Sequence, residues 1–80
     1  MNSSIHLHDS VALLENTRTT DYRTGGPRVV RQGQIGTVVM RYKEGDVEVG
    51  FTGRDGRAYA VVLIAADKLM IVENYEFTGH

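Results

Sequence analysis

An arginine-rich segment in the first half of the chain has the clearest capacity for binding chemistry. It contains four arginines: Arg18, Arg23, Arg28 and Arg31. The only acid among them is Asp21, so four positive charges and one negative give a local balance of +3 in a chain whose net charge is -1. A guanidinium group donates hydrogen bonds in a planar fork that matches carboxylates and phosphates. We therefore predict that these arginines bind a partner, with Tyr22 and Arg41 adding to the contact surface.

Two carboxylates, Asp46 and Glu48, stand two residues apart in a stretch whose apolar side chains alternate. Side chains at this spacing share one face of a β-strand, so this pattern predicts an acidic sheet face. An exposed face offers little desolvation to separate two pKa values, which disfavours acid-base catalysis there. The acidic face and the arginine segment complement each other in charge, so a homo-oligomer is one expected assembly.

The sequence lacks the usual parts of a catalytic or metal centre. It has no cysteine, its three histidines lie near the two ends, and its three serines fall within the first ten residues. A nucleophile, a base and an orienting group are therefore not expected to meet in the core. His6 and His8 would point the same way in an extended chain, but a zinc site needs at least three protein ligands. We predict a non-enzymatic protein without a metal or cofactor.

Length and hydropathy narrow the class of protein. Eighty residues are enough for one core, which makes a single domain the expectation. No apolar run reaches the roughly 18 residues of a membrane span, and the N-terminus lacks the pattern of a signal peptide. A cytoplasmic protein without membrane contact is the default expectation.

Alternating apolar residues and turn signals predict five short strands. They are expected at residues 9–15, 35–42, 46–52, 57–64 and 70–72, with one short 3-10 turn at 65–69. Turns at Gly45 and at Asp55 and Gly56 connect the central strands. Residues 9–15 are apolar on both sides and so are expected to be covered on both, although Asp9 or Ser10 at their start also suits a short helix.

Gly33 and Gly36 are assigned structural roles. Gly33 suits a turn with positive φ, and Gly36 suits a close approach of two strands where a β-carbon would collide. The residues that follow, Thr37–Met40, are β-rich, whereas a phosphate-binding loop needs a helix at that point. In the strand after Gly33, the inward face is assigned to Gly36, Val38, Met40 and Tyr42, with a shift by one residue as the alternative. The strand at 57–64 is apolar on both sides, which suggests a central, strongly curved strand.

The remaining segments are polar. Residues 16–28 have almost no apolar side chain and are interpreted as a long loop that carries most of the arginines. Residues 1–8 are expected to form a flexible tail, 9–73 the folded domain and 74–80 a second tail. Tyr75 and Phe77 in that second tail suit packing on the chain's own domain or on a neighbour, and both alternatives stay open.

The order of the elements predicts an all-β fold, specifically a small five-stranded antiparallel SH3-like barrel. The motif segments Gly33–Val39, Val47–Phe51, Asp55–Gly56 and Ala65–Leu69 resemble a family of small uncharacterised bacterial proteins known as a domain of unknown function. The resemblance covers about residues 9–72, and such proteins are similar in fold to KOW-type barrels. It implies a fold and assigns no activity.

Two functions from different classes follow from the arginine segment. The first is a protein-interaction module that acts through the loop from Arg18 to Arg31 and through the strand edges. The alternative is binding of RNA or another single-stranded nucleic acid through the same loop, with Arg41 and Tyr42 alongside. If four arginines neutralised phosphates, log affinity would fall against log salt with a slope of about -2.8.

Overall fold

The computed structural model describes residues 5–72, and this part of the chain is built from seven strands and one 3-10 turn. Strands dominate and no helix is present among these residues, so the all-β prediction is confirmed. The elements in chain order are β1 (Ser10–Leu13), β2 (Thr17–Thr20), β3 (Pro27–Val30), β4 (Ile35–Arg41), β5 (Asp46–Thr52), β6 (Ala58–Ala65), η1 (Ala66–Lys68) and β7 (Leu69–Ile71).

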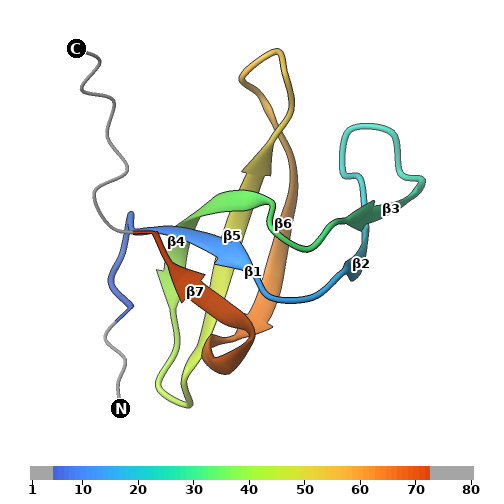
Figure 1. The fold of residues 1–80 in the computed structure, drawn as a ribbon. Coiled ribbons are helices and arrows are strands. Elements are labelled where there is room, and N and C mark those ends of the chain that lie inside the picture. The colour runs from blue at the N-terminus through green and yellow to red at the C-terminus, as the bar shows by residue number, and fades with distance from the viewer. Residues whose placement is uncertain (1–4, 73–80) are drawn as a thin grey trace, which may run out of the picture.

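The strands form two sheets, which are not closed into a barrel (Figure 1). Five strands lie in the order β6-β5-β4-β1-β7, and β2 pairs only with β3 in a separate hairpin. Every pairing is antiparallel. The expectation of a closed five-stranded barrel is therefore wrong. Closure would require the two edge strands to pair, and the edges here, β6 and β7, have no pairing with each other.

The interpretation of residues 16–28 as a loop is also wrong, because most of that segment is the β2–β3 hairpin. Thr17 pairs with Val30 at one end of the hairpin, and Thr20 pairs with Pro27 at the other. Threonine is β-branched and favours extended backbone, so a polar, threonine-rich segment forms a strand when a partner strand lies beside it. The segment looked like a loop because its strands bury little.

The core fills one side of the larger sheet, and β5 supplies its centre. Val47, Val49 and Phe51 are buried at alternate positions, which confirms the period of two in this strand. All three of Val11, Ala12 and Leu13 in β1 are buried, so that strand is covered on both sides as expected. Other buried residues of the core cluster are Ile5, Val30, Val38, Tyr59, Ala60, Ile64 and Leu69.

Irregularities in two strands change which side chains point inward. In β4, Gly36 and Val38 are buried, but the register shifts between Val38 and Met40, and both Met40 and Tyr42 are exposed. The predicted inward face of β4 is therefore correct only for its first half. In β6 a register shift at the start leaves Tyr59 and Ala60, which are successive residues, both buried.

The prediction that residues 57–64 form a central strand is wrong, since β6 lies at the edge of the sheet. Its inner side packs on the core through Ala60 and Ile64. On its outer side Val61 and Leu63 are exposed. Apolar residues on both sides of this strand thus do not correspond to burial on both sides.

Gly36 allows β4 and β5 to approach closely. A β-carbon at this position would lie 2.6 Å from Val49 Cγ1, 2.7 Å from Phe51 Cε1 and 2.9 Å from the backbone oxygen of Gly50. Real β-carbons do not approach other atoms so closely, which makes glycine the residue that fits. Gly33 has φ +89°, in the left-handed region that favours glycine, and it precedes β4.

The described part of the N-terminal segment packs on the larger sheet. Ile5 belongs to the buried core cluster, and the backbone N–H of His8 donates to the carbonyl oxygen of Val38 at 2.8 Å. The predicted tail at 74–80, with Tyr75 and Phe77, lies outside the described residues.

Candidate partner-binding site

The turn of the β2–β3 hairpin is organised by Asp21, the acid within the arginine-rich segment. Its side chain is only 8% exposed. Asp21 Oδ1 accepts the backbone N–H of Arg23 at 2.8 Å and that of Thr24 at 3.2 Å. These hydrogen bonds form an Asx-type turn, in which a side chain takes the place of a backbone acceptor. The Arg23 N–H, with further contributions from Thr24 and Arg28, lowers the pKa of the Asp21 carboxyl.

The second oxygen of Asp21 holds Arg28 in place. Arg28 Nη1 lies 2.9 Å from Asp21 Oδ2, and Arg28 Cζ lies 3.8 Å from the centre of the Tyr59 ring. A guanidinium over an aromatic face gains a cation–π attraction in addition to the ion pair. Tyr59 itself is buried at the start of β6. Arg28 therefore has a fixed position although its side chain is 42% exposed.

A second ion pair ties the hairpin to the turn between β5 and β6. Arg23 Nη1 lies 3.1 Å from Asp55 Oδ2. The backbone N–H of Tyr22 also donates to the carbonyl oxygen of Tyr59 at 2.9 Å. Asp55 Oδ1 accepts the backbone N–H of Arg57 at 2.9 Å, and this bond is the main cause of a lowered Asp55 pKa. The hairpin and the β5–β6 turn thus form one connected site.

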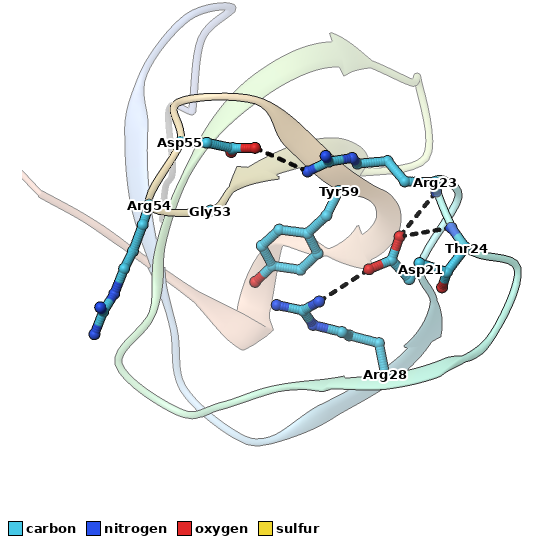
Figure 2. A pocket seen from close by; sticks show the side chains of 8 residues that line it. All are labelled: Asp21, Arg23, Thr24, Arg28, Gly53, Arg54, Asp55 and Tyr59. Atoms are coloured by element: carbon cyan, nitrogen blue, oxygen red, sulfur yellow. Dashed lines mark hydrogen bonds and ion pairs between the residues drawn. The ribbon is translucent and has the colours of Figure 1, made fainter.

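A hollow of about 550 Å³ opens between the hairpin and the β5–β6 turn. Figure 2 shows Tyr59 between the two ion pairs, and Arg54 extending away from both of them. A smaller hollow, of about 260 Å³, lies along the hairpin and is lined by Arg18, Arg28 and Val29. Arg28 borders both hollows. The charged side chains that line the larger one are Asp21, Arg23, Arg28, Arg54 and Asp55.

The structure does not bring all of the predicted binding residues together. Tyr22 is exposed in the hairpin turn, and Arg31 is exposed just after β3. Arg41 and Tyr42 lie beside the β4–β5 turn, at the end of β5 away from the β5–β6 turn, where they line a separate hollow of about 130 Å³. The basic surface therefore consists of the hairpin and the β5–β6 turn, without Arg41.

The predicted acidic pair lies on the outer face of β5 and is half-buried. Glu48 is opposite Met40 of β4 on one side and Leu63 of β6 on the other. Partial desolvation of the Tyr42 hydroxyl, together with the nearby Glu48 carboxylate, raises the pKa of Tyr42. Glu48 and Asp46 make no ion pair with another residue in the range 5–72.

Sequence reasoning missed two central residues of this site. Asp21 was treated only as a charge, although an aspartate followed by Arg23 and Thr24 and then by Gly25 and Gly26 is a recognisable turn signal. No sequence pattern marks Tyr59 as a site residue, because its position under Arg28 depends on the irregular start of β6. Asp55 was predicted as a turn residue, and its ion pair to Arg23 spans 32 positions in the sequence.

Within the described residues, no three histidine, cysteine, aspartate or glutamate side chains come together as metal ligands. His6 Nδ1 lies 3.9 Å from Asp9 Oδ2, and the backbone N–H of His6 donates to the same oxygen. Between residues 5 and 72 there is also no helix with the length and apolar character needed to cross a membrane.

The fold defines a small all-β domain in which an open five-stranded sheet carries an arginine-rich hairpin. The chain belongs to the family described as Domain of unknown function (DUF4926), whose model matches residues 7–76. No curated protein and no solved structure matches the chain.

Proposed function

We propose that this chain is a non-catalytic protein-interaction module that binds an acidic segment of a partner protein in the hollow beside Arg28. The fixed guanidinium of Arg28 carries this proposal. The ion pair with Asp21 uses one of its five N–H donors, and the Tyr59 ring holds its plane. A positioned guanidinium loses little side-chain entropy when it binds a carboxylate, so it is a better anchor than a mobile arginine.

The charge around the larger hollow supports an anionic ligand. Three arginines and two aspartates line it, which leaves one excess positive charge. Both aspartates are already paired, and Arg54 makes no ion pair with any of the residues that the structure describes. A carboxylate entering the hollow would therefore meet Arg28 as a positioned donor, while Arg54 adds positive charge to the lining.

Two features favour a protein carboxylate over a nucleic acid. The Arg28 guanidinium covers one face of Tyr59, and Tyr59 is buried, so this ring is a poor platform for a base. Arg41 and Tyr42, which the nucleic-acid alternative needs, lie beside a different turn.

The test is a binding titration followed by NMR chemical shifts, with two probes. One probe is an acetylated, glutamate-rich heptapeptide, and the other is a single-stranded oligouridine. We expect the peptide to shift the backbone signals of Thr24, Arg28 and Gly53, which surround the hollow. Arg28→Gln should weaken peptide binding about ten- to a hundredfold, because a hydrogen bond to a charged group is worth about 1.5–3 kcal/mol.

Arg41→Gln is the matched control, since it removes the same charge from a different part of the surface and should leave peptide affinity unchanged. Equal losses in both variants would show that only net charge matters and would refute the site. Oligouridine binding with a salt slope near -2.8, together with no peptide shifts, would replace this proposal with nucleic-acid binding.

A further inference from the structure

The outer edge of β6 presents backbone groups whose direction follows from the neighbouring pairings. The backbone N–H of Tyr42 donates to the carbonyl oxygen of Asp46 at 2.9 Å, so Asp46 faces β4. Backbone groups alternate sides along an antiparallel strand, and Val47 therefore faces β6. Its partner is Ile64, which faces back toward β5. The neighbours of Ile64 must then face away from the sheet.

By this alternation, Val61, Leu63 and Ala65 direct their N–H and C=O groups to the open edge. None of the three makes a backbone hydrogen bond to a described residue outside the β5–β6 ladder. The start of β6 is different, because the hairpin covers it through the hydrogen bond from Tyr22 to Tyr59. The open stretch is thus three outward-facing residues long, between the hairpin and η1.

This stretch lacks the features that usually keep sheet edges apart. Residues Ala58–Ala65 include no charged residue and no proline. Val61 is 44% exposed and Leu63 is 58% exposed. An apolar, uncharged edge of this kind invites pairing with another strand.

We propose that a second copy of this chain pairs with this edge, antiparallel and centred on Leu63. In that register, Leu63 stands opposite Leu63 of the second copy, and Val61 stands opposite its Ala65. Each outward-facing residue then meets an outward-facing residue, so every exposed N–H and C=O of the three positions finds a partner. The two five-stranded sheets join into one continuous sheet, and the exposed leucines contact each other across the two-fold axis.

Charges at the two ends of the edge favour a second copy. In this register Asp67, in η1 just after β6 of one copy, falls opposite Tyr59 of the other copy, two residues from Arg57. Neither Asp67 nor Arg57 makes an ion pair within residues 5–72. Antiparallel pairing brings these opposite charges together at both ends, whereas parallel pairing would set like charges against each other. This interface is separate from the hollow beside Arg28 and does not depend on the proposed function.

The test is the mass in solution, measured by light scattering during size-exclusion chromatography over a range of concentrations. The full chain is expected to give about twice its mass of 8.9 kDa. Leu63→Lys should give the single-chain mass, because two lysines would face each other at the axis. Met70→Lys adds the same charge on β7, at the other edge of the sheet, and should remain dimeric. A wild-type monomer at millimolar concentration, or a dimeric Leu63→Lys variant, would overturn the proposal.

A charge exchange gives a second test that leaves β6 untouched. Asp67→Arg should weaken dimerisation about two- to thirtyfold, the range expected when the two exposed ion pairs of the dimer are lost. Adding Arg57→Asp to that variant should restore it, whereas failure of the double variant to recover would refute the antiparallel register. Arg28→Gln should leave the dimer intact while it reduces peptide binding, so failure of one proposal is distinguishable from failure of the other.

Discussion

The hairpin and the outer edge of β6 lie side by side, but the polar groups of the hairpin are hydrogen-bonded and those of the edge are not. In the hairpin, one carboxylate, Asp21, accepts two backbone N–H groups and holds an arginine. At the edge, backbone donors and acceptors have no partner among the described residues, and the side chains around them are apolar. The first region is ordered by its own contacts, whereas the second leaves its backbone groups open to another strand.

This difference separates two modes of recognition. A preorganised charge such as Arg28 selects a ligand by its chemistry, because a carboxylate must reach a fixed guanidinium. An open strand edge selects by shape and register, because any backbone offers the same donors and acceptors. Both proposed modes fit one small domain because its hairpin branches away from the sheet and leaves Val61–Ala65 at an open edge.

The largest effect is expected from Gly36, which lies in the core that both regions share. Gly36→Val places side-chain carbon where Val49, Phe51 and the Gly50 backbone already lie, so overpacking should cost about 3 kcal/mol or more of unfolding free energy. Urea unfolding followed by circular dichroism measures this loss. Peptide binding and dimerisation should fail together, since both need the β4–β5 pairing.

Gly50→Ala is the control for that substitution. A β-carbon at Gly50 has its nearest contact at 3.6 Å, from Val39 Cγ1, which is an ordinary distance. We expect a change below about 1 kcal/mol in unfolding free energy. If Gly36→Val were as mild as Gly50→Ala, the close approach of β4 and β5 would not exist in solution.

The two regions also show what the sequence could predict and what it could not. The period of two in β5 and the glycine turns predicted the centre of the sheet correctly, because they depend on local backbone geometry. The hairpin was missed because Thr17 and Thr19 are polar, and β6 was placed in the centre because Val61 and Leu63 are apolar. In both strands the composition does not measure burial. Burial here depends on which strands are neighbours, and the sequence alone does not determine that.

The binding site could also be predicted only in part, because its contacts depend on which strands are neighbours. Arg23 and Arg28 were identified from their type and spacing. Their partners Asp55 and Tyr59 come from a distant hairpin, and only the docking of β2 against β6 brings them together. A contact of this kind has no local sequence signal.

The next largest effect is expected from substitutions of Asp21, the residue that orders the hairpin turn. Asp21→Ala removes the acceptor of two backbone N–H groups and the anchor of Arg28, so the melting temperature should fall and peptide binding should be lost. Asp21→Asn keeps one oxygen for the two backbone N–H groups but puts an NH2 donor where Oδ2 accepts from Arg28, so it should lower the melting temperature less than Asp21→Ala while still releasing Arg28. Dimerisation through β6 should persist in the Asn variant, which would show that the two regions work independently.

The Asp21 carboxyl also gives a pH dependence with a definite sign. Its pKa is lower in the folded protein than in the unfolded chain, so its contribution to stability is present above the unfolded value, about 3.9. That contribution is lost as the pH falls through the lower folded value. Melting curves of Asp21→Asn should therefore depend less on pH below about 4 than those of the wild type, and parallel curves would show that Arg28 and the backbone do not hold the carboxylate.

The smallest effect on the single chain, and the most informative about the edge, is expected from Leu63→Thr. Threonine is β-branched and favours a strand, and an exposed substitution of this kind usually changes stability by less than about 0.5 kcal/mol. In dilute solution the wild type and the variant should therefore unfold at nearly the same urea concentration.

At high protein concentration the wild type gains stability from pairing, because association stabilises the folded state by mass action. The variant, which lacks the leucine contact at the two-fold axis, should gain less, so the difference between the two midpoints should grow with concentration. A difference that is large in dilute solution and constant with concentration would mean that Leu63 supports its own chain, and the edge of β6 would then resemble the hairpin in being complete by itself.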